Sequence, residues 1–287
     1  MNQTNQKNGR ADPMASPAGG PAVIFVGGGK GGVGKTHRAL MTSSCLVKAG
    51  MTPFLIEVEA APRISLIHPD RCLHVPFAKL GARELRRNPS RLAAVFDPAL
   101  VAIEEKLEAG VFVIVDLAAN ADFALADYLL QLEGLSVLGA GQSTAFMSVT
   151  TGDSAALEDA LTGLAVIGAA LPASRRLAVV NDVVASAPCK PASDKFVAFD
   201  EHARRGGALP TAYVTALEAE RLLTFAKARQ VPFEKLRAPN HSALAATLGV
   251  PSPEAARDYL AFARHSQEWE GVLQQLGVLA PLEDEAS

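Results

Sequence analysis

The chain alternates short apolar runs with longer stretches in which apolar residues recur every three or four positions. Short runs of this kind indicate buried strands, and the longer stretches indicate amphipathic helices. The pattern predicts strands at 22–27, 53–58, 111–115, 135–138 and 177–181, and a further short strand at 211–215. It predicts helices at 35–49, 80–88, 90–109, 196–205, 216–230, 241–248 and 253–279, and irregular structure over 63–80. Continuous apolar strands separated by helices favour an α/β fold, with a mostly parallel sheet flanked by helices.

A phosphate-binding loop is predicted between the first strand and the first helix. Residues 29–36 read Gly-Lys-Gly-Gly-Val-Gly-Lys-Thr, which matches the G-x-x-x-x-G-K-[ST] pattern in its proper context. The glycines let the backbone N–H groups point at phosphate oxygens, the lysine reaches the β- and γ-phosphates, and the threonine hydroxyl binds Mg²⁺. An accidental glycine-rich turn is the competing interpretation. The residues expected to hold a nucleoside triphosphate are Gly29, Lys30, Gly31, Gly32, Val33, Gly34, Lys35 and Thr36.

A second lysine, Lys30, directly follows the first glycine of the loop. The string Lys-Gly-Gly-Val-Gly-Lys-Thr resembles the deviant Walker A motif of the ParA/MinD family of P-loop ATPases. The resemblance covers about residues 22–182 and implies ATP and Mg²⁺ as ligands, and a homodimer that forms on ATP binding. It also implies that Lys30 contacts the nucleotide of the other subunit and acts in catalysis beside Lys35, because a second cation stabilises γ-phosphate charge only when two subunits meet. A solvated loop lysine is the alternative.

A carboxylate ends the strand predicted at 111–115. Five apolar residues run into Asp116, the arrangement of a Walker B strand, whose carboxylate helps to hold Mg²⁺ between the phosphates. The alternative role for Asp116 is the N-cap of a helix that starts near Ala121. The resembled family usually continues with Thr-Pro-Pro, whereas this chain has Leu117-Ala118-Ala119-Asn120, so its second switch segment is altered.

Two glutamates follow the strand predicted at 53–58, where the resembled family has Asp-x-Asp. The resemblance aligns Glu57 with the carboxylate near the metal and Glu59 with the carboxylate near the attacking water. A water-orienting group must lie within roughly 2.6–3.2 Å of that water, so a longer side chain can slow hydrolysis. The alternative is a pair of surface glutamates.

Asn181 ends the strand predicted at 177–181. The resemblance implies that it hydrogen-bonds the adenine, since an amide supplies both a donor and an acceptor. A purely conformational asparagine at a strand end is the other interpretation.

Composition and charge narrow the possible partners and compartment. The net charge of −3 excludes a global attraction for nucleic acid, so DNA binding requires a local patch. Two arginine clusters are candidates for such a patch, Arg83, Arg86, Arg87 and Arg91, and Arg204 with Arg205. The chain shows no secretory signal, and no apolar run reaches the roughly 18 residues of a membrane span. Three scattered cysteines fit a reducing compartment, and we expect a cytoplasmic protein.

Four segments are predicted along the chain. Residues 1–20 form a disordered leader, 21–235 a P-loop ATPase domain, 236–280 a helical C-terminal extension and 281–287 an acidic tail. The expected function is a nucleotide switch in plasmid partition or conjugative DNA transfer, with DNA or a partner protein of those processes as partner. The alternatives are a non-hydrolysing or very slow nucleotide-binding interaction protein, and a metabolite ligase of the same fold that resembles dethiobiotin or cobyrinate amide synthetases.

Overall fold

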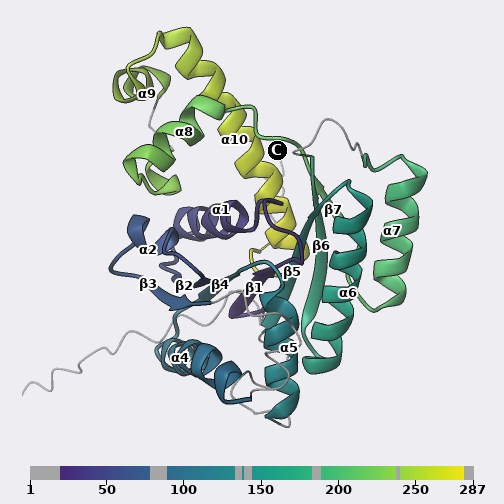
Figure 1. The fold of residues 1–287 in the computed structure, drawn as a ribbon. Coiled ribbons are helices and arrows are strands. Elements are labelled where there is room, and N and C mark those ends of the chain that lie inside the picture. Colours follow the sequence, from purple (N-terminus) through teal and green to yellow (C-terminus); the bar gives the residue numbers. More distant parts are fainter. Residues whose placement is uncertain are drawn as a thin grey trace, which may run out of the picture.

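A parallel sheet forms the centre of the molecule (Figure 1). The computed structural model describes residues 20–77, 89–132, 138, 144–182, 189–236 and 240–280. Within these residues seven strands hydrogen-bond in the order β3-β2-β4-β1-β5-β6-β7, and every neighbouring pair is parallel. The predicted fold class, an α/β fold with a mostly parallel sheet flanked by helices, is therefore confirmed.

The strands are short and mostly buried on both faces, which accounts for their apolar sequences. Their bounds are β1 Val23–Gly27, β2 Phe54–Glu59, β3 Cys72–Pro76, β4 Val113–Leu117, β5 Thr144–Thr151, β6 Arg175–Asn181 and β7 Ala212–Val214. Five of these strands overlap predicted strands.

Four helices cover one face of the sheet, α4 (Pro89–Glu108), α5 (Ala121–Gln131), α6 (Ser154–Ala170) and α7 (Asp194–Arg205) (Figure 1). Their apolar sides pack on strand residues such as Phe25, Val115 and Phe146, which are at most 1% exposed. The apolar stripe of each helix thus faces the sheet, and its polar side faces solvent.

The other face is covered by α1 (Lys35–Lys48), α2 (Ile64–Ile67), α8 (Glu220–Arg229), α9 (His241–Leu248) and α10 (Ser252–Gln275), with a 3₁₀ helix at Phe233–Leu236. Trp269 and Leu273 of α10 are fully buried and share this core with Ile24 of β1 and Leu46 of α1. The apolar residues of α10 therefore serve core packing. Among the described residues, no helix is long and apolar enough to cross a bilayer.

The sequence pattern missed two strands. β5 contains three threonines and a serine, yet all eight residues are buried, so its polar composition concealed a central strand. β3 lies at the sheet edge, where His74 and Pro76 interrupt the apolar positions, and the prediction of irregular structure over 63–80 was wrong there. The helix predicted at 80–88 lies outside the described residues, as does the strand predicted at 135–138 apart from Leu138, which is not in a strand.

The sheet order places the chemistry-bearing residues together. β1 lies between β4 and β5, and the chain leaves its carboxyl end through residues 29–36. Asp116 on β4 pairs in register with Val26 of β1 and with Glu57 of β2. In open parallel sheets ligands bind beyond the carboxyl ends of the strands, and this is the edge where the predicted site residues gather.

Candidate nucleotide-binding site

The backbone of residues 28–34 curls in a way that requires glycine. Gly28 has φ +144°, and a Cβ there would lie 2.4 Å from the Val149 carbonyl oxygen. Gly34, at the start of α1, has φ 99° in the left-handed region, and a Cβ there would lie 2.8 Å from the side-chain nitrogen of Asn181. Side chains at either position would clash with the strands behind the loop, so the glycines are needed for conformation and for close approach.

Lys35 lies within the loop at the first position of α1. It is 7% exposed, and its Nζ donates a hydrogen bond to the backbone oxygen of Lys30 at 2.9 Å. Burial lowers the pKa of Lys35, whereas the negative charges of Asp116, Asp122 and Glu59 oppose this effect. The ammonium group is thus buried beside the loop, where the charges of these three carboxylates favour its protonated form.

Thr36 and Asp116 meet directly. The Thr36 hydroxyl donates to Asp116 Oδ2 at 2.7 Å, which joins the end of the loop to β4. Asp116 is 2% exposed, and its Oδ1 is buried without a hydrogen-bond partner among the described residues. Burial raises the pKa of Asp116 to about 7, although the Thr36 hydrogen bond and the Lys35 charge act in the opposite direction. An unpartnered buried carboxylate oxygen beside a hydroxyl fits a hard cation such as Mg²⁺.

The structure gives Glu57 a different role from the predicted metal ligand. Its Oε1 accepts from the backbone N–H groups of Arg63 and Ile64 at 2.7 and 2.9 Å. Its Oε2 accepts from the backbone N–H and the hydroxyl of Ser65 at 3.2 and 3.1 Å. These four bonds fill the acceptor capacity of the carboxylate. Glu57 therefore holds the chain at the start of α2, and its metal role is not supported by this geometry.

Glu59 lies at the wall of a cavity of about 380 Å³ in front of the loop, together with Gly31, Lys35 and Thr36. Within the part of the chain that the structure describes, its carboxylate accepts only one hydrogen bond, from the adjacent backbone N–H of Ala60 at 3.1 Å. The group is therefore available to a ligand in the cavity.

Arg63 and Asp122 are two charged residues near the loop that sequence reasoning missed. Arg63, whose backbone N–H donates to Glu57, lines the same cavity as Glu59 and adds a cation to its wall. Asp122, at the start of α5, is fully buried, and burial raises its pKa to about 6. Only the position of Asp122 six residues beyond Asp116 could have drawn attention to it, and no sequence signal marks Arg63.

Lys30 does not line the cavity in front of its own loop. Its Nζ instead contacts Asp153 Oδ1 at 2.8 Å, and both side chains are about half exposed, at 47% and 45%. Asp153 is the N-cap of α6 and also accepts from the backbone N–H of Ala156. The second lysine is thus directed to the side of the loop that faces α6.

Asn181 lies behind the loop and is 1% exposed. Its Nδ2 donates to the Val33 carbonyl oxygen at 2.7 Å, and its Oδ1 accepts from Arg38 Nε at 2.8 Å. In this arrangement both ends of the amide are engaged by the protein, which does not support the predicted contact with adenine.

The comparisons with known proteins found similar solved structures but no similar sequence. No protein-family model and no curated protein sequence matches the chain. Among solved structures, the MinC:MinD cell division protein complex of Aquifex aeolicus matches with a TM-score of 0.47 and 15% identity, covering 91% of this chain and 98% of that chain. MinD of Pyrococcus horikoshii complexed with Mg-ADP matches with the same TM-score and identity, covering 87% and 97%.

A plasmid partition protein of Borrelia burgdorferi matches with a TM-score of 0.39 and 11% identity, covering 68% of this chain and 90% of that chain. At these values the assignment of a P-loop nucleotide-binding fold rests on the strand order and on the loop at 29–36 of this chain itself.

Proposed function

We propose that this chain is an ATP- and Mg²⁺-dependent ATPase that dimerises on nucleotide binding and acts as a nucleotide switch. The observation that carries the proposal is the contact between Thr36 and Asp116 at 2.7 Å, beside a loop whose lysine, Lys35, is buried. These three groups are the ones that phosphate and Mg²⁺ binding requires at a P-loop.

Thr36 and Asp116 would hold Mg²⁺ together with phosphate oxygens of the nucleotide. No group of three or more His, Cys, Asp or Glu side chains suited to a metal occurs among the described residues. In the proposed site, water and phosphate oxygens would complete the coordination of the ion. When bound, the ion would neutralise charge on the β- and γ-phosphates. Lys35 would bind the same phosphates, and Glu59, at the cavity wall, would orient the attacking water.

We propose dimerisation because the Lys30 side chain does not line the cavity in front of its own phosphate loop. Its side chain is half exposed and is held only by Asp153 among the described residues. A contact with the nucleotide of a second subunit would give this cation the role that the resembled ParA/MinD motif implies, namely stabilising charge on the γ-phosphate.

A second candidate is a nucleotide-binding interaction protein that hydrolyses ATP very slowly or not at all. One observation favours it, because Glu57, one of the two carboxylates expected near the metal and water, is fully used by backbone N–H groups and by Ser65. Only Glu59 then remains at the cavity wall to orient water.

The cellular process we propose is plasmid partition or conjugative DNA transfer. It is favoured by the departures from the resembled family at Glu57, at Glu59 and after Asp116, which separate this chain from the chromosomal and division-site members.

DNA is the proposed partner of that process, bound through arginines. Arg83, Arg86 and Arg87 lie outside the described residues. Arg91 is exposed on α4 and Arg204 and Arg205 at the end of α7, and α5 and α6 lie between these helices. The described arginines therefore form two separate basic positions rather than one patch.

Equilibrium binding of Mg-ATP, followed by steady-state hydrolysis with and without DNA, tests the proposal. The variant Lys35→Ala should lose nucleotide binding, because it removes a charge-assisted contact worth about 1.5–3 kcal/mol. Lys48→Ala is the matched control, since it removes a lysine from the other end of the same helix. If Lys35→Ala binds Mg-ATP as tightly as the wild type, the nucleotide site is wrong. Binding without turnover, in the presence and absence of DNA, would favour the second candidate.

A further inference from the structure

One side chain joins the phosphate loop to the helix that follows it. Asn181 Nδ2 donates to the Val33 carbonyl oxygen at 2.7 Å, while Asn181 Oδ1 accepts from Nε of Arg38 at 2.8 Å and from its Nη2. A guanidinium group can only donate, so the oxygen of the amide must face Arg38 and the nitrogen must face the loop. The orientation of the Asn181 amide is therefore set by Arg38.

Arg38 is in turn held by α10, far along the chain. Its side chain is 2% exposed, and Nη1 contacts His265 Nε2 at 2.6 Å. Its Cζ lies 4.9 Å from the centre of the Trp269 ring, close enough for a cation–π interaction. Trp269 Nε1 donates to the Thr42 hydroxyl, which donates to the Arg38 carbonyl oxygen. Arg38 is thus linked to α10 both through its side chain and, through Thr42, at its backbone.

His265 acts as a neutral acceptor in this connection. Burial and the nearby Arg38 charge lower the pKa of His265 to about 3, so the ring is uncharged at neutral pH and can accept at Nε2. No carboxylate of the described residues hydrogen-bonds to Arg38, and burial lowers the pKa of Arg38 to about 9, although the charge of Glu268 raises it. The guanidinium remains charged at neutral pH and depends on Asn181 and His265 for its hydrogen bonds.

The contact with Val33 has a direct effect on the loop. A trans peptide is planar, so its C=O and N–H groups point to opposite sides. Because the Val33 carbonyl is turned toward Asn181, the N–H of Gly34 is turned away from it, and Gly34 lines the cavity in front of the loop. Backbone N–H groups directed into that cavity are what a phosphate loop offers to its ligand.

We propose that Arg38 and His265 are positioning residues for phosphate binding, which act through Asn181 to fix the Val33–Gly34 peptide. The C-terminal helix α10 thereby contributes to the affinity for nucleotide without touching it. This inference rests on the proposed nucleotide-binding function. It differs from a base-reading role for Asn181, because a fixed peptide affects every ligand that carries the phosphates, whatever its base.

Asn181→Asp separates the two roles. A carboxylate keeps the size of the side chain and its contact with Arg38, but it cannot donate to the Val33 carbonyl. Binding of Mg-ATP, Mg-GTP and magnesium tripolyphosphate is measured by titration calorimetry on the full chain. We expect affinity to fall by about tenfold, and by the same factor for all three ligands. A loss confined to Mg-ATP would mean that Asn181 reads adenine, and unchanged affinity for all three would mean that it does not support the loop. Either result overturns the inference.

His265→Phe tests the contribution of α10. It keeps an aromatic ring but removes the acceptor of Arg38 Nη1, so affinity for tripolyphosphate should fall severalfold. His265→Gln, whose amide oxygen can accept the same bond, should restore most of the affinity. When His265→Phe is added to Asn181→Asp, the affinity should fall little further, because both residues act on the loop through the same chain of contacts. If His265→Phe lowers the thermal unfolding temperature but leaves all three affinities unchanged, α10 has only a structural role and the inference fails.

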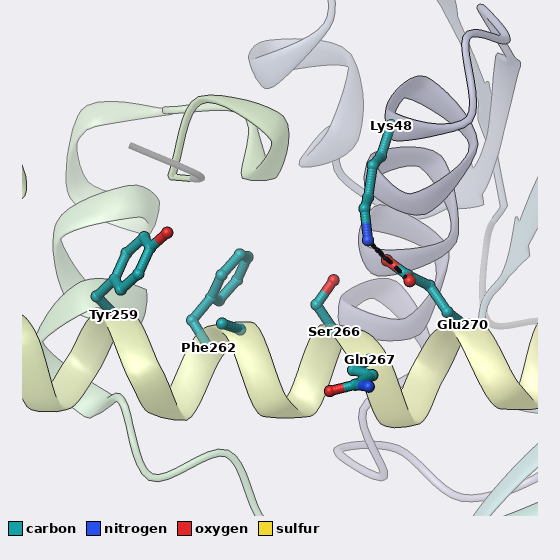
Figure 2. Close-up of a pocket in the computed structure, with 7 residues that line it drawn as sticks. Lys48, Tyr259, Phe262, Ser266, Gln267 and Glu270 are labelled. Carbon is teal, nitrogen blue, oxygen red and sulfur yellow. Dashed lines mark hydrogen bonds and ion pairs between the residues drawn. The ribbon is translucent and has the colours of Figure 1, made fainter. Parts of the chain in front are cut away.

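Glu270→Gln is the matched control on the same helix. Glu270 contacts Lys48 at the C-terminal end of α1 at 2.8 Å, beside a cavity that is also lined by Tyr259 and Phe262 (Figure 2). The Glu270→Gln substitution perturbs the packing of α10 on α1 without touching Arg38. The affinities of this variant for all three ligands should therefore equal those of the wild type. A wild-type protein that binds none of the three ligands overturns the proposed function and this inference together. A wild type that binds while the variants are unaffected overturns the inference alone.

Discussion

Lys30 of the phosphate loop and Asp153 at the start of α6 form an ion pair with a separation of 2.8 Å. Asp153 has a second task, since its side chain also accepts from Ala156 N–H and caps α6. The pair competes directly with the proposed contact of Lys30 across a dimer interface. Because both groups are about half exposed, the pair is weak and can be exchanged for another partner.

Asp153→Ser should strengthen the ATP-dependent dimer by about two- to fivefold, because it releases Lys30 while keeping a side chain that can cap α6. Sedimentation velocity with Mg-ATP and with Mg-ADP measures the effect. The companion variant Lys30→Ala should keep ATP affinity within a few-fold but fail to dimerise. A Lys30→Ala protein that still forms the ATP-dependent dimer would contradict the cross-subunit role.

Binding of Mg²⁺ should depend on pH through Asp116. Burial raises the pKa of this carboxyl to about 7, and only the ionised form attracts the cation. The affinity for Mg²⁺ in the presence of nucleotide should therefore rise by up to about tenfold per pH unit below pH 7 and level off above it. Titrations between about pH 5.5 and about pH 8.5 would follow this rise.

Asp116→Asn removes the charge and provides the control. A raised pKa means that the folded state binds the proton more tightly than the unfolded state does. Stability without ligand therefore falls as pH rises from the usual range of an aspartate to about 7. The variant should be more stable than the wild type above pH 7 and should lose the pH-dependent binding of Mg²⁺. Thermal unfolding that shows the same pH dependence in both proteins would contradict this.

Glu57→Gln distinguishes a structural carboxylate from a metal ligand. The amide replaces one accepting oxygen with a donor that faces the N–H and hydroxyl of Ser65, so the free energy of unfolding should fall by about 1–3 kcal/mol. Urea denaturation measures this change. The Mg²⁺ concentration needed for nucleotide binding should stay close to that of the wild type. A large rise in that concentration would mean that Glu57 is a ligand of Mg²⁺ and contradict its purely structural role.

Of the two glutamates Glu57 and Glu59 on β2, Glu59 lines the cavity, and Glu59→Asp shortens its side chain by one methylene. A displaced catalytic group can change a rate by about a hundredfold, so we expect the single-turnover rate of ATP hydrolysis to change by at least tenfold, with nearly unchanged affinity. Single-turnover hydrolysis of radiolabelled ATP is the measurement. Equal rates in the two proteins would mean that Glu59 does not position the water.

The placement of residues that belong to a local backbone pattern could be predicted from the sequence. The loop at 29–36 and the carboxylate at Asp116 belong to short strand–turn–helix patterns, and the structure brings Thr36 and Asp116 together as expected. The roles of Glu57 and Asn181 could not be predicted in the same way. Each depends on partners, Ser65 and Arg38 respectively, whose position is set by the tertiary fold.

Strands were predicted where burial coincided with apolar sequence. β5 was missed because three of its buried positions are threonines. A buried threonine does not contribute to an apolar run, so the sequence pattern gave no sign of this strand. The ion pair of Lys30 with Asp153 spans 123 positions, so no local pattern could reveal it.

The connection from Val33 through Asn181 and Arg38 to His265 also has a consequence for biosynthesis. Ribosomes deliver the chain from its N-terminus, so the loop emerges long before the helix that supports it; Arg38 and His265 are separated by 227 positions. Until α10 has emerged, Arg38 lacks the acceptor and the aromatic ring that bury it. A nascent chain should therefore gain full nucleotide affinity only once α10 has emerged, which would keep chains that lack α10 from joining ATP-dependent assemblies.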